Sequence, residues 1–195
     1  MEDRQPPSRR LSSVSDIPNF PARDLVHLRE REARQEVSLG VDFTTANRLS
    51  TGLYGSGWAV FSTILAWLPW LLALASIGTA VWLSNYWLLL GTILSLLGPF
   101  LANPYNPIGR PFKVIALVAV AGAIWFAFTG RTTLAVLLGA LALSYWSTWL
   151  MYHANQERLR RNALSDEAFF LALFQDGKLG IRISESGESL WGPIS

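Results

Sequence analysis

Hydrophobic positions fill the middle of the chain, and polar positions are confined to its two ends. Over residues 49–152 the only charged side chains are those of Arg110, Lys113 and Arg131. An ionised side chain at the centre of a bilayer costs about 2.5–3.5 kcal/mol on an insertion scale, so a stretch this long and apolar is typical of membrane-embedded chain. We therefore expect the middle of the chain to lie in a lipid bilayer.

Four apolar segments of this stretch are long enough to cross a bilayer as helices, which takes about 17–25 residues each. Helices are expected because hydrocarbon leaves any unpaired backbone group unsatisfied. The tight connections Ser84-Asn85 and Gly130-Arg131 join the segments in pairs, and the proline-rich linker 103–112 separates the pairs. The pattern thus predicts an all-α, polytopic integral membrane protein with four transmembrane helices arranged as two helical hairpins. The predicted spans are residues 57–83, 86–102, 113–129 and 132–152.

Arginine and lysine are distributed unequally between the predicted connections. With the N-terminus in the cytoplasm, the inner side would carry eight in the N-terminal tail, two in the middle linker and five in the C-terminal tail, against Arg131 alone outside. This asymmetry follows the positive-inside rule and predicts that both termini are cytoplasmic. Arginine outnumbers lysine 14 to 2, which indicates a GC-rich coding sequence and favours a bacterial source. We expect a multi-pass protein of the cell membrane, which in a bacterium is the inner membrane.

The polar ends are expected to form short cytoplasmic arms. Residues 1–20 are rich in Pro, Ser and Arg with few aliphatic residues, which is typical of disorder, and residues 21–37 have the pattern of a helix. In the other arm we expect the last helix to continue to Ala163 and a short amphipathic helix to end at Gly177, before a small C-terminal β-hairpin. The predicted organisation is a disordered tail (1–20), a helix with a pre-membrane segment (21–56), a four-helix transmembrane bundle (57–152) and a C-terminal arm (153–195).

Two tryptophans in the first predicted span are candidates for binding a hydrophobic ligand. Trp67 and Trp70 flank Pro69 in mid-span, where a proline frees a backbone carbonyl and favours a kink. The indoles could line a groove for a bound lipid, quinone or pigment, or they could simply pack around the kink or against a partner subunit. No cofactor is predicted from this pattern, and both interpretations stay open.

Three further groups of residues are candidates for packing interfaces. Small residues at a spacing of four allow helices to approach closely, within a hairpin or between proteins. A short amphipathic helix with a broad aromatic face needs a membrane surface, the bundle or a partner to cover it. The candidates are Ala119, Ala123 and Ala127 in the third span, Ala140, Ser144 and Thr148 in the fourth, and Phe169, Phe170, Leu173 and Phe174 in the C-terminal arm.

The residue types that carry most chemistry are missing from the predicted spans. No acidic, basic or histidine side chain lies inside them, although proton relays and many ion-coupled transporters need such groups. The chain has no cysteine, and neither His27 nor His153 has a second ligand at a suitable spacing, so no metal or catalytic site is predicted. The N-terminal tail balances eight Arg with eight acidic residues, which gives no basic face for nucleic acid.

These observations favour a structural or accessory subunit of a larger membrane protein complex. Such a protein would not be an enzyme, and its partners would be the lipid bilayer and other membrane subunits, with contact to lipid, quinone or pigment left open. The first alternative is a homo-oligomeric channel or small-solute transporter. The second alternative is a lipid- or isoprenoid-modifying membrane enzyme, although paired interfacial carboxylates and a nucleophile with a base are not evident in the sequence.

Overall fold

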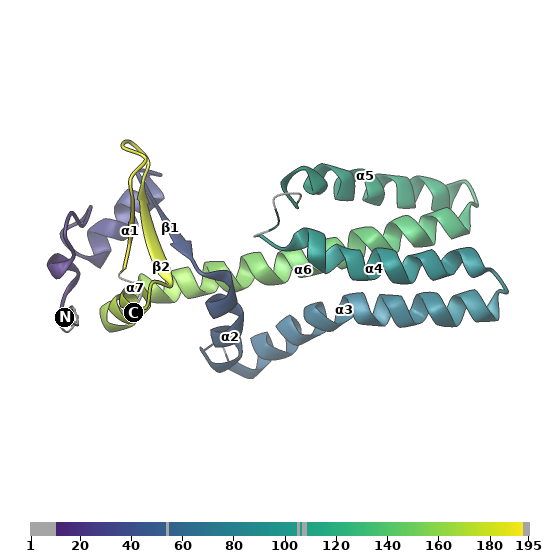
Figure 1. Ribbon diagram of the computed structural model, residues 1–195, viewed down its shortest axis with the longest axis horizontal. Helices are drawn as coiled ribbons and strands as arrows, with labels where there is room; N and C mark the ends of the chain where they lie inside the picture. The colour runs from purple at the N-terminus through teal and green to yellow at the C-terminus, as the bar shows by residue number, and fades with distance from the viewer. Residues whose placement is uncertain (1–10, 54, 105, 107–108, 193–195) are drawn as a thin grey trace, which may run out of the picture. The chain divides into compact units, whose positions relative to one another are not determined.

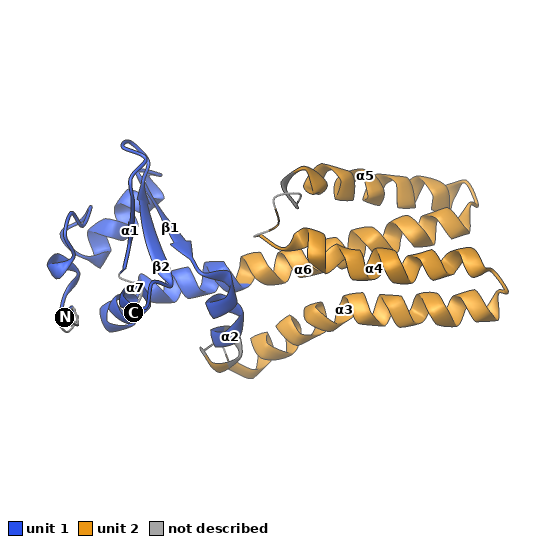
Figure 2. Ribbon diagram, in the orientation of Figure 1, with its two compact units in different colours: residues 1–50, 155–195 blue, residues 51–154 orange. Residues whose placement is uncertain are grey.

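The computed structural model describes residues 11–53, 55–104, 106 and 109–192. Their backbone is mostly helical, as predicted, and it includes one three-stranded sheet (Figure 1). The chain divides into two compact units (Figure 2). Unit 1 combines residues 1–50 with residues 155–195, and unit 2 is the continuous stretch 51–154.

Unit 2 consists of apolar helices that run side by side (Figure 1). Its elements are α3 (Gly55–Trp82), the 3-10 turn η2 (Tyr86–Leu88), α4 (Leu89–Ala102), α5 (Gly109–Phe128) and the first part of α6 (Thr132–Ala163). Helices α3, α5 and α6 are each long and apolar enough to cross a membrane, whereas the apolar segment Tyr86–Ala102 is shorter. By length and composition, three of the predicted spans are therefore present.

The linker between the second and third predicted spans is shorter than expected. The sequence predicted a non-helical segment over residues 103–112, but α5 already begins at Gly109. Pro111 lies in the first turn of this helix, where a backbone N–H has no intrahelical partner and its loss therefore costs nothing. Pro99 likewise lies inside α4, which continues to Ala102.

Glycines allow the helices of unit 2 to approach one another closely. A Cβ atom added at Gly91 of α4 would lie 2.6 Å from the hydroxyl oxygen of Ser76 in α3. One added at Gly98 would lie 2.7 Å from the Cβ of Ser144 and 2.8 Å from the backbone nitrogen of Tyr145, both in α6. Small side chains therefore bring α4 into contact with α3 on one side and with α6 on another, as small residues do in membrane helix pairs.

Unit 1 is built from both ends of the chain, so it is not a pair of separate arms. The N-terminal part contributes η1 (Val14–Asp16), α1 (Leu25–Ala33), β1 (Val37–Val41) and most of α2 (Phe43–Leu53). The C-terminal part contributes the end of α6, α7 (Glu167–Gln175), β2 (Leu179–Ile183) and β3 (Ser189–Trp191).

The sheet joins the two chain ends directly. Its strand order is β1-β2-β3 with both pairs antiparallel, and Val37 pairs with Ile183 while Gly180 pairs with Trp191. The β2–β3 pair is the C-terminal hairpin that the sequence predicted. Strand β1 was not predicted, and it supplies the additional strand that a lone two-stranded hairpin lacks in water.

One hydrophobic core runs through unit 1 and draws on both chain ends. Leu28 of α1, Leu159 of α6 and Phe170 of α7 are fully buried in it together with Leu179 and Ile181 of β2. Complete burial of each of these side chains contributes about 1.5–3 kcal/mol, so the shared core favours association of the two chain ends.

The N-terminal arm differs from its prediction in two respects. Residues 11–20, expected to be disordered, contain η1 with a capping box on Ser13, and Val14 and Ile17 are buried in the core; residues 1–10 lie outside the described residues. The helix expected over residues 21–37 ends at Ala33, and Val37 already belongs to a strand. The physical reason is the same for both differences: apolar residues too sparse for a core of their own are covered by the C-terminal arm.

Candidate functional site

An aromatic cluster occupies one end of unit 2, where the end of α4, the start of α5 and the later turns of α6 meet. We define it as Phe112, Tyr145, Trp146, Trp149 and His153. Consecutive ring centroids are 5.9, 5.5, 5.4 and 4.9 Å apart. The buried side chains of Leu101, Ala102 and Ala116 pack beneath the first four rings. Rings at these distances interact favourably beyond their burial, and such belts are typical of the membrane–water interface.

Lys113 brings a positive charge to this cluster. Its Nζ atom lies 4.7 Å from the centroid of the Trp149 ring, which is a cation–π contact. The imidazole of His153 stacks on the same indole at 4.9 Å and 18°. The arrangement therefore holds a cation and a hydrogen-bonding imidazole on one amphipathic ring, with side chains from α5 and α6.

The buried polar groups of unit 2 are hydroxyls that bond to helix backbones. Ser76 donates to the carbonyl of Leu72 at 2.9 Å, Thr148 donates to the carbonyl of Ser144 at 3.0 Å, and Ser144 itself donates to the carbonyl of Ser95 across the α4–α6 contact. The Ser95 hydroxyl is buried without a hydrogen-bond partner among the described residues. These bonds satisfy the hydroxyls of Ser76, Ser144 and Thr148 within the bundle, and hydroxyls of this kind do not titrate near neutral pH.

Trp67 and Trp70 lie on the outer surface of α3. They are 60% and 56% exposed, whereas Pro69, Ala73 and Ser76 form the buried side of the same helix. The structure thus places both indoles where lipid or a partner protein can contact them and not in the interior of the bundle. Binding of a quinone, pigment or lipid by these residues stays a prediction.

The two stripes of small residues have different surroundings. In α6 Ala140, Ser144 and Thr148 are all buried, and Ser144 packs against α4. In α5 the exposure increases along the stripe: Ala119 is buried, Ala123 is half-buried and Ala127 is exposed. The α6 stripe is therefore an internal contact, and only the far end of the α5 stripe is open to another molecule.

The phenylalanine-rich face of α7 is covered by this chain itself. Phe170, Leu173 and Phe174 are buried, and Phe169 is partly buried against the same core. Phe20 of the N-terminal arm meets Phe170 edge to face at 6.0 Å. The surface that the sequence required for this helix is thus the N-terminal arm, so these four residues do not form a free docking face.

A cluster of ion pairs connects the chain ends of unit 1 at its surface. The Arg160 guanidinium lies 3.2 Å from Glu32 and 2.5 Å from Glu157, and Glu157 also pairs with Arg161 at 2.8 Å. Burial raises the pKa of Glu32 above its ordinary value despite the lowering effect of Arg160, and the charge of Glu157 adds to the rise. Among the described residues no group of three or more His, Asp or Glu side chains is placed to hold a metal ion.

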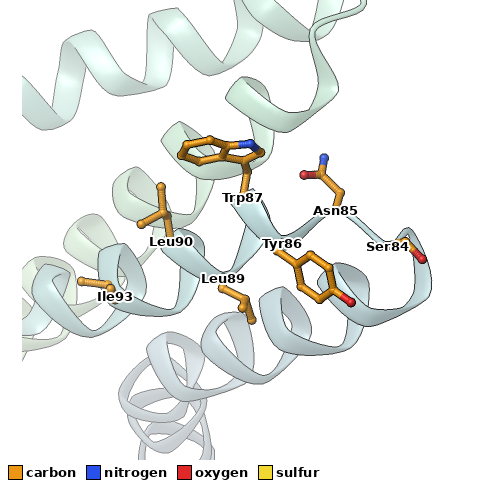
Figure 3. Close-up of a pocket in the computed structure, with 7 residues that line it drawn as sticks. All are labelled: Ser84, Asn85, Tyr86, Trp87, Leu89, Leu90 and Ile93. Carbon is orange, nitrogen blue, oxygen red and sulfur yellow. The ribbon is translucent and has the colours of Figure 1, made fainter.

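A hollow with a volume of about 610 Å³ lies at the turn between α3 and α4 (Figure 3). Trp87, Leu90 and Ile93 lie along one side of this segment, and the Asn85 amide donates to the Thr133 hydroxyl at 2.9 Å. The lining is mainly apolar and comes from one stretch of chain, residues 84–93. Binding sites for polar ligands gather polar groups from several elements, so this hollow suits a lipid tail better than a polar substrate.

Comparison with known proteins gives no match: no family model, no curated protein and no solved structure is significantly similar to this chain.

The contact between Lys113 and Trp149 was not predicted from the sequence. The aromatic enrichment near the ends of the spans was a signal that rings gather there, but the relative rotation of α5 and α6 decides which rings meet.

Proposed function

We propose that this protein is a non-catalytic accessory subunit of a larger membrane protein complex in a bacterial inner membrane. In this proposal four helices cross the bilayer as two hairpins, with both termini in the cytoplasm. The protein would act through the lateral surface of its membrane unit and through the folded unit made from its two ends. Contact with a lipid, quinone or pigment would involve the exposed indoles of Trp67 and Trp70.

The segment Tyr86–Ala102 is the critical one for a four-span topology. It consists of three residues of 3-10 helix and 14 of α-helix, which together rise about 27 Å. A hydrocarbon core is about 30 Å thick, and a small mismatch is accommodated by local thinning of the bilayer. The contact of Gly91 with Ser76 supports a return of the chain alongside α3. Fifteen of the 16 Arg and Lys residues would then lie on the cytoplasmic side.

The observation that carries the subunit proposal is the charge content of unit 2. Residues 51–154 contain no Asp or Glu, and their only basic or imidazole side chains are Arg110, Lys113, Arg131 and His153. Proton transfer and ion translocation through a bundle depend on ionisable groups that face its interior. A unit whose buried polar side chains are hydroxyls, several of them bonded to backbone, is therefore best suited to association.

Of the three helices long enough to cross a membrane, α5 has the smallest share of buried residues. Of residues Pro111–Phe128 only 11% are buried within the structure, compared with 39% of the apolar part of α6. Leu117, Val118 and Trp125 are each more than half exposed on it. Such a helix needs either lipid or the helices of another subunit around it, and the open end of its alanine stripe at Ala127 permits close approach.

The proposal is tested by purification of the native protein in mild detergent. We expect a complex well above 21.6 kDa that contains other polypeptides. The Ala127→Leu variant should lose these partners, because the larger side chain blocks close approach at α5. The same change at Ala75, which is exposed on α3, is the matched control and should retain them.

Two results would contradict the subunit role. One is a chain that migrates alone or only with copies of itself. The other is solute flux through liposomes that contain only this chain, which would favour the homo-oligomeric channel or transporter instead.

A further inference from the structure

Lys113 and His153 meet at one indole, and neither makes an ion pair within the part of the chain that the structure describes. Lys113 is exposed, as is His153, while Trp149 between them is half-buried. The cation–π contact holds the ammonium group beside the aromatic cluster but leaves its charge uncompensated. An anionic ligand that binds here therefore meets no competing carboxylate among the described ion pairs.

Unit 2 itself contains no neutralising group. Its sequence, residues 51–154, has no acidic residue, and Arg110 adds a further positive charge just before Lys113. An exposed lysine beside an aromatic belt lies at the depth of the lipid headgroups. Each basic residue near an anionic membrane surface contributes about 1 kcal/mol of attraction.

We propose that Lys113, Trp149 and His153 form a binding site for the headgroup of an anionic phospholipid. The Lys113 ammonium and an N–H of the His153 imidazole donate to the phosphate oxygens, and the Trp149 ring positions both groups. Two helices contribute to the site, so a bound lipid links the start of α5 to α6. The inference rests on the membrane placement proposed above but not on the role as a subunit.

The site can be tested by native mass spectrometry of the full-length chain in detergent, titrated with phosphatidylglycerol or with phosphatidylcholine. We expect tighter binding of phosphatidylglycerol, and in Lys113→Gln a loss of about fivefold in its affinity. Arg131→Gln removes the same charge at the α5–α6 turn and should leave the affinity unchanged. Lys113→Arg keeps the cation and should restore binding, whereas His153→Gln should weaken it less than Lys113→Gln.

Three outcomes would overturn the site. The first is equal binding of the two lipids, and the second is an equal loss in Lys113→Gln and Arg131→Gln. The third is an unchanged lipid preference in Lys113→Gln together with a lower melting temperature in lipid-free detergent, which would show that Lys113 stabilises the fold and does not bind the headgroup. A chain that purifies without partners would contradict the subunit role but leave this measurement intact.

Discussion

Glu32 and Glu167 connect the two chain ends of unit 1, but they do so under different electrostatic conditions. Glu167, exposed at the start of α7, accepts hydrogen bonds from the Ser13 hydroxyl and the Val14 amide, both at 2.9 Å. Glu32 lies beside Arg160, yet its burial outweighs that attraction and raises its pKa. An ion pair seen in a structure is therefore not by itself evidence that the ionised form stabilises the fold.

The raised pKa of Glu32 makes the stability of unit 1 depend on pH. Because the fold favours the protonated carboxyl, its contribution is complete below the ordinary pKa of glutamate and is lost as the pH rises through the raised value. We expect Glu32→Gln, which mimics the protonated form, to melt at or above the temperature of the native chain at pH 7. The melting curves of the two proteins should converge as the pH falls toward 4. If Glu32→Gln were clearly less stable than the native chain at pH 7, the raised pKa of Glu32 would be contradicted.

At the scale of elements, the contact between α4 and α6 depends on the lack of a side chain at Gly98. The position faces Ser144 and the backbone of Tyr145, with no space for a methyl group. Gly139 of α6, by contrast, has no atom within 4 Å of the place where a Cβ would stand, apart from its chain neighbours and its own helix backbone. The two glycines form a matched pair, because one lies at a helix contact and the other does not.

We expect Gly98→Ala to destabilise the membrane unit by about 1–3 kcal/mol, the usual cost of overpacking a tight contact. Gly139→Ala should change the stability by less than about 0.5 kcal/mol. Thermal unfolding in detergent measures both. Equal melting temperatures for the two variants would show that α4 and α6 do not approach as closely as described.

The helices could be predicted at this scale better than the strands. Each apolar segment has a composition that favours a membrane helix whatever its neighbours are. The alternation of Val37, Leu39 and Val41 was also visible, but a five-residue pattern does not identify a partner strand. That partner begins at Leu179, far along the chain, and only the folded unit brings the two together.

At the scale of the whole molecule, residues near both ends of the chain build one core. A change in the N-terminal arm must therefore affect the C-terminal arm. Leu28 is fully buried in this core, whereas Val26 on the same helix is 66% exposed. Substitutions at Leu28 and at Val26 therefore distinguish a shared core from two independent arms.

Leu28→Asp should destabilise unit 1 by about 3–5 kcal/mol, because it leaves an unpaired charge in the core. Limited proteolysis should then cleave the chain near Phe170 and Phe174, which become accessible. Val26→Asp should remain as resistant as the native chain. Protection of α7 in Leu28→Asp would show that the arms fold separately.

The proposed topology predicts which positions can be reached from each side of the membrane. The chain has no cysteine, so a single introduced thiol gives an unambiguous signal. Arg131→Cys should react with an impermeant maleimide in intact cells. Val26→Cys and Ser186→Cys, both at exposed positions, should react only after permeabilisation. If Val26→Cys and Ser186→Cys reacted from opposite sides of the membrane, the four-span arrangement would be refuted.

The sequence alone determined that the middle of this chain forms apolar helices, three of them long enough to cross a membrane. The bilayer penalises every buried charge and every unpaired peptide group, residue by residue, so no knowledge of contacts is needed. The tertiary structure decided the rest: which side of each membrane helix is covered, which aromatic ring holds Lys113, and that Val37 pairs with Ile183. Those outcomes depend on helix rotation and on strand pairing between distant parts of the chain, and only packing sets either of them.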